Sequence, residues 1–405
     1  MSSEAVGAGE AVDLERIGAA RRAGAGLVKR TPIVSSVGLS TTAGGAVTLK
    51  AENLQRTGAF KIRGAMSKLA SLGDGAARGV TAGSAGNHAQ ALALAARHFG
   101  VPCEIFVPSG ASITKIAACQ RYGATVHEVG QSLDEAVAAS RRRAEEARMA
   151  FSHPIDAADV VAGQATLGLE LVEDVDDLSC VVVPLGGGGL AAGVAIAVKS
   201  QRPDVRVVGV QAAACAPYLG DPPPAGPILT LADGIAVKSP GQLTAPLVER
   251  WLDEIVAVDE DVIADAMVLL MERAKLLVEG AGAVGVAAVL DGKVRHSGGT
   301  TCVVLSGGNL DLGVVPSLIR RNENEAGRRL TVFVRIDDRP GGLARLLATF
   351  AAAGANLIEV QHVREGLDLH VRETGIRATF EVRGPAHAAD TIAAAESAGY
   401  DVTSE

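Results

Sequence analysis

Four short stretches of the sequence combine residue types and spacings that could carry chemistry. The first is Lys61 in GAFKIRGA (58–65), where the lysine follows Phe60 and stands among apolar residues and glycine. A lysine withdrawn from water has a lowered pKa, and its neutral amine can attack a carbonyl to form a Schiff base. Lone lysines are usually exposed and structurally neutral, so this stretch alone does not identify a site.

The second stretch is TAGSAGNHAQ (81–90), a polar glycine turn that runs directly into a predicted helix. Free backbone N–H groups at that helix start would suit a carboxylate or a phosphate, although capping by Ser84 or Asn87 is an adequate alternative. The spacing Ala82-x-Ser84-x-Gly86 also resembles the nucleophile elbow of a hydrolase. The first glycine of that motif is missing, and no Asp/His pair stands in a recognisable context, which disfavours a hydrolase.

The third stretch is PLGGGGLAAG (184–193), between a predicted strand and a predicted helix. Four successive glycines cost conformational entropy, so we expect more than a connector: their amides can surround a phosphate. The spacing Gly186-x-Gly188-x-x-Ala191 also fits a dinucleotide-binding fingerprint. The next strand ends at Gln211, where that fingerprint requires an acid, so an NAD enzyme is the weaker alternative.

The fourth stretch is VVLSGGN (303–309), a strand that ends in a hydroxyl and two glycines. A plain strand-to-turn junction would explain it equally well when it is taken alone. Ser112-x-x-Lys115 matches the SxxK pattern of penicillin-binding enzymes, but so short a pattern arises readily by chance and is set aside.

The elements that must position these stretches alternate along the chain. From about residue 61 to 310, β-branched runs such as CEIFVP, CVVVPL and TTCVVLS alternate with alanine-rich helical stretches. The predicted helices include HAQALALAARHFG, which ends at Gly100, and VIADAMVLLMERAKLL (262–277). This alternation predicts an α/β fold with βαβ units and mostly parallel sheets. Glycine-rich turns in such a fold place a ligand at the carboxyl ends of the strands.

A different pattern follows a polar run at 320–327. Residues 329–405 alternate as strand, helix, strand, strand, helix and strand, which predicts a ferredoxin-like βαββαβ module. None of the nine lysines of the chain lies in it, so lysine chemistry belongs upstream. We expect a catalytic domain over 1–321 with a smaller subdomain at roughly 51–150, a linker at 322–328 and a separate domain at 329–405.

Composition excludes several classes of protein. The 405 residues are 48% hydrophobic and 21% charged, with a net charge of -8, so wholesale disorder and general nucleic-acid binding are disfavoured. The five cysteines are scattered without metal spacing, and the N-terminus shows no secretory signal. The uncharged run 180–198 contains Pro184 and four glycines, which argues against a membrane span. We expect a soluble cytoplasmic protein without a metal site.

Taken together and in order, these segments resemble the fold-type II pyridoxal phosphate enzymes, and within them the threonine dehydratase (threonine ammonia-lyase) family. The resemblance spans nearly the whole chain through TPI, ENLQRTGAFKIRGA, SAGNHAQ, GGGGL, ADGIAV, VEGAGA and SGGN, and the tail, with DDRPGGL, resembles an ACT regulatory domain. It implies two open, twisted, mostly parallel sheets with flanking helices. It also implies deamination of L-threonine to 2-oxobutyrate and ammonia by loss of water, with L-serine as a second substrate.

The resemblance implies roles for individual residues. Lys61 would bind pyridoxal 5'-phosphate covalently and serve as the base, Phe60 would pack on the pyridine ring, and Asn87 would hydrogen-bond the 3-hydroxyl. Ser306 would meet the pyridine nitrogen, and Glu279 would lie near the ring. The phosphate would be held by Gly186, Gly187, Gly188, Gly189 and Leu190. The substrate carboxylate would be held by Ser84, also expected to be catalytic, with Ala85, Gly86, Asn87 and His88.

Departures from relatives narrow the implied activity. Serine racemases of this fold carry a serine where this chain has Ala85, so we expect little racemisation. Their divalent-metal site uses an acid where this chain has Gln211, and the AAACAP that follows lacks a second acid, so we expect no such site. Ala59 replaces the serine that more often precedes Phe-Lys.

The tail and the overall activity each leave an alternative open. ACT domains pair and bind small amino acids near the first strand-to-helix turn, here Asp338, Gly341 and Gly342, facing Asn356. We expect a homo-oligomer, dimer or tetramer, with isoleucine or valine as effector; the alternative is a module for stability or dimerisation only. The alternatives for the whole chain are a serine dehydratase or another pyridoxal phosphate β-elimination or replacement enzyme, and a non-catalytic amino-acid sensor.

Overall fold

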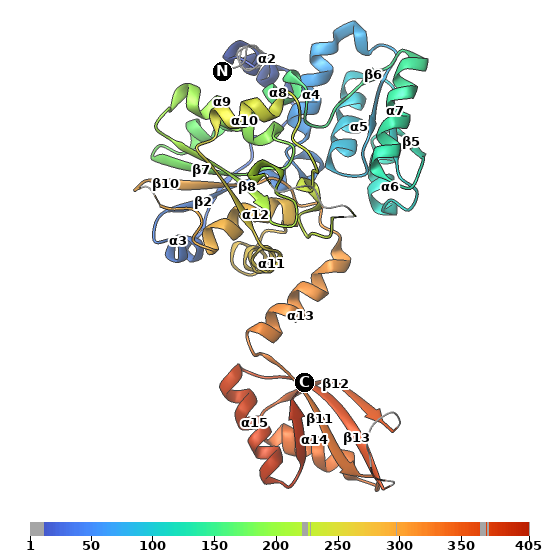
Figure 1. The fold of residues 1–405 in the computed structure, drawn as a ribbon, viewed down its shortest axis with the longest axis vertical. Coiled ribbons are helices and arrows are strands. Elements are labelled where there is room, and N and C mark those ends of the chain that lie inside the picture. Colours follow the sequence, from blue (N-terminus) through green and yellow to red (C-terminus); the bar gives the residue numbers. More distant parts are fainter. Residues whose placement is uncertain are drawn as a thin grey trace. The chain divides into compact units, whose positions relative to one another are not determined.

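The computed structural model of the chain describes residues 12–220, 226, 228–296, 298–364, 370 and 372–404. The chain divides into two compact units at Leu310/Asp311, here called the N-terminal and the C-terminal unit. The N-terminal unit contains two sheets and the C-terminal unit one (Figure 1). Most of the N-terminal stretch in which we expect no secretory signal lies outside the described residues.

The larger sheet of the N-terminal unit has six strands in the order β1-β2-β10-β7-β8-β9. Only β1 is antiparallel to its neighbour; the other four pairings are parallel, as the βαβ alternation predicts. The central strands are buried on both faces, which explains their continuous runs of valine. The strands are β1 Ile33–Ser35, β2 Val47–Ala51, β7 Leu178–Pro184, β8 Arg206–Ala212, β9 Glu254–Val258 and β10 Thr300–Leu305.

Helices flank this sheet, and those at 14–24, 158–174, 189–201 and 244–251 share one large apolar core with it. They are α2 Leu14–Gly24, α3 Val37–Ala43, α8 Ala158–Asp174, α9 Gly189–Gln201, α10 Thr244–Trp251, α11 Glu260–Leu269 and α12 Gly280–Leu290. The helix predicted over 262–277 ends earlier, in a π-helical turn at Leu270–Ala274. Lys275 follows with φ 60°, and this break lets Glu279 reach the turn after β10, where its N–H donates to Gly307 O at 3.1 Å.

The smaller sheet is fully parallel, in the order β5-β4-β3-β6. Its strands are β3 Val80–Gly83, β4 Cys103–Val107, β5 Thr125–Glu128 and β6 Ala150–Phe151, and its helices are α4 Ile62–Leu72, α5 Asn87–Phe99, α6 Ile113–Arg121 and α7 Leu133–Ala147. Gly100 ends α5 in the left-handed region at φ 68°, as glycine at that position predicts. All five cysteines are buried: Cys103 and Cys119 lie in this part, the other three with the larger sheet.

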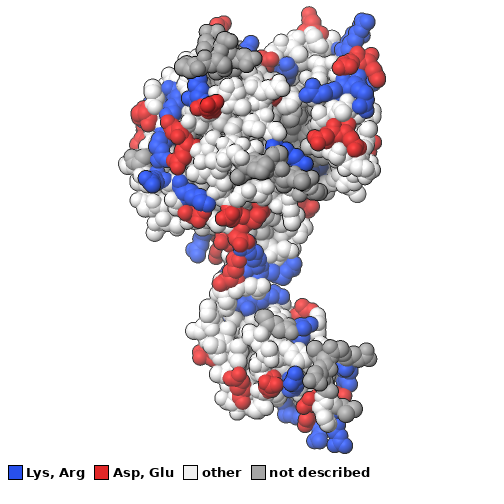
Figure 2. Space-filling view, viewed as in Figure 1, with Lys and Arg blue, Asp and Glu red and all other residues white. Residues whose placement is uncertain are grey.

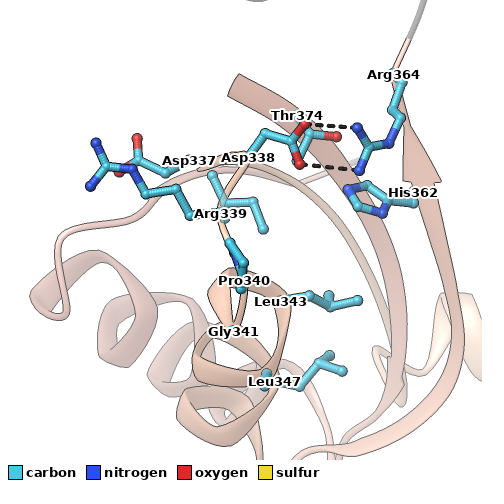
Figure 3. A pocket seen from close by; sticks show the side chains of 12 residues that line it. Asp337, Asp338, Arg339, Pro340, Gly341, Leu343, Leu347, His362, Arg364 and Thr374 are labelled. Carbon is cyan, nitrogen blue, oxygen red and sulfur yellow. Dashed lines mark hydrogen bonds and ion pairs between the residues drawn. The ribbon is translucent and has the colours of Figure 1, made fainter. Parts of the chain in front are cut away.

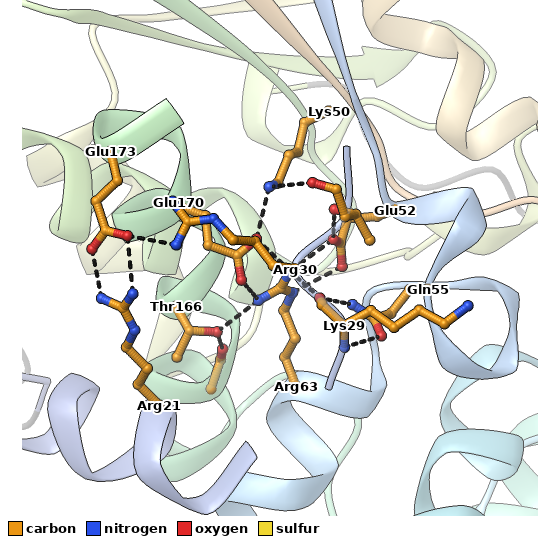
Figure 4. A network of polar contacts seen from close by, with 12 residues as sticks. Arg21, Lys29, Arg30, Lys50, Glu52, Gln55, Arg63, Thr166, Glu170 and Glu173 are labelled. Atoms are coloured by element: carbon orange, nitrogen blue, oxygen red, sulfur yellow. Dashed lines mark hydrogen bonds and ion pairs between the residues drawn. The ribbon is translucent and has the colours of Figure 1, made fainter. Parts of the chain in front are cut away.

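A buried ion network ties the two parts of the N-terminal unit together (Figure 4). Arg63, in the first turn of α4, binds Glu52 through Nη2 at 2.8 Å and Glu170 through Nη1 at 2.7 Å. Lys50, fully buried on β2, binds Glu170 at 2.7 Å and Asp174 at 3.2 Å. Burial opposes ionisation of Glu52, but the Arg63 guanidinium keeps the pKa of that carboxyl below its ordinary value. The start of α4, next to Lys61, is thereby anchored to β2 and α8.

The C-terminal unit is a four-stranded antiparallel sheet in the order β12-β13-β11-β14, which is the ferredoxin-like order predicted for this module. Its elements are β11 Arg329–Asp337, α14 Gly342–Ala352, β12 Asn356–Val363, β13 Glu373–Glu381, α15 Pro385–Ser397 and β14 Asp401–Ser404. Phe350 and Phe380 pack against each other in its core with ring centroids 4.5 Å apart. The helix α13, Val315–Glu325, occupies the first part of the stretch expected as a linker.

The surface mixes both signs of charge. On the face shown in Figure 2, Lys and Arg are interspersed with Asp and Glu, and no broad basic area is present among the residues drawn in colour. Within the described ranges, no helix has the length and apolar character needed to cross a membrane.

Candidate active site

Lys61 is the residue immediately before α4, in the segment that links the two sheets of the N-terminal unit. Its Nζ donates to the carbonyl oxygen of Pro154 at 3.1 Å and lies 5.0 Å from the centroid of the Phe60 ring. Burial lowers the pKa of Lys61 to about 8, and the nearby Glu279 carboxylate partly opposes this change. The amine is therefore available in neutral form close to neutral pH, as nucleophilic attack on a carbonyl requires.

The SGGN stretch lies directly against the lysine segment. Ser306 is buried at the end of β10, and its carbonyl oxygen accepts the N–H of Phe60 at 3.0 Å. Ala59 and Gly307 form an antiparallel bridge one residue away. Residues more than 240 positions apart in the sequence are thus joined at the carboxyl edge of the larger sheet.

The polar turn at Ser84 leads from β3 into α5, as predicted. Gly86 is the N-cap of α5, and no side chain among the described residues caps this helix, while Ser84 Oγ accepts the N–H of Gly86 at 3.3 Å. The first-turn amides, beginning with Asn87, therefore remain available to an anion. Ala85 packs partly buried beside the small-sheet core. His88 contributes only its backbone here, because its side chain is buried against Ser152 O at 3.1 Å and burial lowers its pKa to about 3.

A chain of hydrogen bonds fixes the side chain of Asn87. Its Nδ2 donates to Glu279 Oε1 at 2.7 Å, and its Oδ1 accepts from Asn309 Nδ2, also at 2.7 Å. Asn309 Nδ2 also donates to Thr57 O at 2.7 Å. Burial, reinforced by the charge of Asp233, raises the pKa of Glu279 to about 7. Asn309 belongs to the SGGN stretch, but the sequence indicated no role for it, since its partners lie 222 and 252 positions away.

The glycine loop 186–189 connects β7 to α9 and leaves no room for side chains. A Cβ on Gly187 would lie 1.8 Å from Ile155 Cδ1, and one on Gly186 would lie 2.9 Å from Ile235 Cα. Gly188 is the N-cap of α9 with φ 92°, and no side chain caps the helix. Backbone amides thus line the helix start, and Leu190 follows them buried in the core.

The segment His153–Asp156 connects the lysine to the glycine loop, although it belongs to none of the sequence motifs named above. Pro154 accepts the Lys61 hydrogen bond, and Ile155 packs against the loop. The signal that could have found it is the polar SHPID sequence directly after the short strand β6, at the carboxyl edge of the smaller sheet.

These residues fit pyridoxal phosphate. A desolvated amine suited to bind an aldehyde, a side-chain-free cradle of amides at a helix start suited to a phosphate, and the immobilised Asn87 all belong to one connected set of contacts. Across the described ranges, no group of three or more His, Cys, Asp and Glu side chains could share a metal ion. Gln211 is buried, and its Oε1 accepts the N–H of Tyr218 at 3.1 Å.

In the C-terminal unit, the turn after β11 opens into a hollow of about 610 Å³ (Figure 3). Asp338 and Gly341 line it, together with apolar side chains of α14, and Gly342 begins that helix. Asp338 is paired across the hollow with Arg364 at 2.7 Å. Asn356, which we expected to face the turn, lies at the other end of β12 from the lining residue His362, and its Nδ2 donates to Glu381 at 3.2 Å.

Comparisons with known proteins agree with this geometry. A family model described as pyridoxal-phosphate dependent enzyme matches residues 25–307. The L-threonine ammonia-lyase of Thermotoga maritima is 43% identical over 404 residues, which cover 96% of this chain and 99% of that protein. The L-threonine ammonia-lyase of Geobacter sulfurreducens is 43% identical over 380 residues, or 92% of this chain and 94% of that protein.

Solved structures give the same family. A threonine deaminase from T.th. has a TM-score of 0.70 and 38% identity, and the match covers 74% of this chain and 99% of that one. Maize serine racemase has a TM-score of 0.72 and 33% identity, over 78% of this chain and 99% of that one. This chain belongs to the family of pyridoxal-phosphate dependent enzymes.

Proposed function

We propose that the protein is an L-threonine ammonia-lyase, which converts L-threonine to 2-oxobutyrate and ammonia and acts also on L-serine. The observation that carries the proposal is 43% identity with an L-threonine ammonia-lyase over 96% of the chain, tail included. The site described above supports it, because the buried amine of Lys61 and the glycine cradle suit the cofactor of this family.

Different residues of the chain have different roles in the reaction. Lys61 would hold the cofactor and would take the Cα proton of the substrate on Nζ; its lowered pKa suits a base that must be neutral. The amides at Ser84–His88 hold the substrate carboxylate at the start of α5, with the Ser84 hydroxyl as a catalytic partner. Pyridoxal phosphate, when bound, withdraws electrons from Cα and so makes the elimination of water possible.

Cofactor contacts are assigned in the same way. Phe60 would pack on the pyridine ring, Asn87 would orient the 3-hydroxyl, Ser306 would meet the ring nitrogen, and Glu279 would lie beside the ring. Gly186–Leu190 would hold the phosphate.

The catalytic domain covers 1–321 and the regulatory domain 329–405. The free, buried thiols suit a cytoplasmic enzyme.

A turnover series with threonine, serine and O-acetylserine tests the substrate assignment. We expect 2-oxobutyrate from threonine at a higher kcat/KM than pyruvate from serine. A preference for serine would favour a serine dehydratase, and consumption of O-acetylserine with a thiol would favour a β-replacement enzyme. Lys61→Ala is the control and should lose both the visible cofactor absorbance and turnover; a colourless wild-type protein that binds amino acids would favour the sensor.

We further propose that the hollow at the first turn of the C-terminal unit binds a small amino acid such as isoleucine or valine. Apolar Leu343 and Leu347 and the charged pair Asp338–Arg364 offer partners for an aliphatic side chain and for the two charged groups of an amino acid. A volume of about 610 Å³ is within the range of small-molecule sites. Calorimetric titration of the full-length protein with isoleucine and valine tests this proposal, with Leu343→Asp as the variant expected to lose binding.

A further inference from the structure

Thr244 controls the orientation of one peptide unit in the glycine loop. It is fully buried at the first position of α10, and its hydroxyl donates to the carbonyl oxygen of Gly187 at 2.6 Å. Because the peptide bond is trans, the N–H of Gly188 points in the opposite direction to that carbonyl. The Thr244 hydroxyl therefore determines where the Gly188 amide is presented.

The hydrogen bond from Thr244 is needed because the glycine loop alone does not fix the direction of the Gly187–Gly188 peptide. Glycine has no Cβ to limit φ and ψ, so the peptide between Gly187 and Gly188 can reorient easily. Gly188 already occupies the left-handed region, and α9 has no side-chain cap. Ile155 fills the space beside Gly187, but it is apolar and cannot select the direction of a carbonyl.

Asp156 in turn holds Thr244 in place. Its Oδ1 accepts the N–H groups of Leu243 at 2.8 Å and Thr244 at 3.1 Å, and its Oδ2 accepts that of Gln242 at 3.0 Å. A Cβ on Gly241 would lie 2.5 Å from Asp156 Oδ1, so the turn closes tightly around the carboxylate. One side chain thus orders the whole turn that precedes α10.

We propose that Thr244 and Asp156 are positioning residues for the cofactor phosphate. Thr244 acts on the Gly187–Gly188 peptide, and Asp156 acts through Thr244. The inference rests on the proposed function only in its cofactor, not in its substrate.

The test compares two ligands that differ by the phosphate group, pyridoxal 5'-phosphate and pyridoxal, binding to apoenzyme in equilibrium dialysis. Thr244→Val keeps the shape and removes the donor; we expect its Kd for pyridoxal phosphate to rise about five- to tenfold and its Kd for pyridoxal to change less than about twofold. Thr244→Ser keeps the hydroxyl and should stay within about twofold of wild type for both ligands. Asp156→Asn should weaken binding of pyridoxal phosphate selectively, as Thr244→Val does.

The outcomes separate the two proposals. Equal weakening of both ligands by Thr244→Val, or no weakening of either, overturns the inference. If Thr244→Val does not fold, Asp156→Asn decides, and an unchanged ratio of its two Kd values overturns the inference. If the wild-type protein binds pyridoxal phosphate but the ratio of the two Kd values is the same in the variants as in wild type, this inference alone is overturned. A wild-type protein that binds no pyridoxal phosphate overturns the proposed function as well.

Discussion

Replacing Lys61 by methionine is expected to stabilise the cofactor-free protein at neutral pH. Burial lowers the pKa of Lys61 from 10.5 to about 8, so below pH 8 the charged amine costs about 3 kcal/mol of folding free energy. Methionine removes that cost but also the hydrogen bond to Pro154 O at 3.1 Å, which stabilises by about 1 kcal/mol. The net gain in the free energy of unfolding at pH 7 is about 2 kcal/mol.

The direction of the pH dependence follows from the lowered pKa. Between pH 8 and 10.5 the folded protein has released the Lys61 proton while the unfolded chain still binds it, so wild-type stability rises with pH. At pH 9.5 the remaining cost is roughly half as large, and the advantage of Lys61→Met shrinks to less than about 1 kcal/mol.

Urea unfolding of the apo proteins, followed by the fluorescence of Trp251, measures this difference, because the only tryptophan lies on α10 of the N-terminal unit. Lys68→Met is the matched control: Lys68 lies on α4, the helix that follows Lys61, in an ion pair with Asp159 at 3.5 Å near the surface, and its loss should change stability by less than about 1 kcal/mol. A Lys61→Met variant less stable than wild type at pH 7, or with the same advantage at both pH values, would refute the reasoning.

Three further predictions concern other parts of the site. Arg63→Met leaves Glu52 buried without its cation and should cost about 3–5 kcal/mol in urea unfolding; a loss below about 1 kcal/mol would contradict the network in Figure 4. Because the pKa of Glu279 is raised to about 7, its carboxylate destabilises the fold above pH 7 but not below 4.5, so Glu279→Gln should stabilise the apo protein by about 3 kcal/mol at pH 8 and by less than about 1 at pH 5. Ala85→Ser should increase D-serine formation from L-serine, measured by chiral chromatography, and no increase would remove Ala85 as a reason to expect little racemisation.

Local signals in the sequence predicted the elements well. The end of α5 at Gly100 follows from a residue that tolerates positive φ, and the parallel sheets follow from valine runs alternating with alanine-rich helices. The six elements of the tail were predicted equally well, because each of them is bounded by polar or glycine residues. The helix over 262–277 was predicted too long, because helix propensity does not distinguish an α-helical turn from a π-helical one. Here the π-helical turn ends the helix and brings Glu279 to Gly307.

The supporting contacts of the site were not predictable in the same way. Asn309 meets Asn87 across 222 positions, and Asp156 accepts amides 86 to 88 positions away. Such pairs have no local period or composition; they exist only once both sheets are assembled. The residues that match motifs could be assigned expected roles from sequence, whereas those that hold them in place needed the fold.

The positions of the cysteines allow the opening of the two sheets of the N-terminal unit to be measured separately. Burial raises the pKa of Cys103 to about 12 and that of Cys302 to about 11, so alkylating reagents at neutral pH react only when the surrounding structure opens. Cys103 and Cys119 report on the smaller sheet, and Cys180, Cys215 and Cys302 on the larger one, while residues 311–405 contain no cysteine. Mass spectrometry of pulse-labelled protein would therefore give a separate opening rate for each of the two sheets, while residues 311–405 would take up no label.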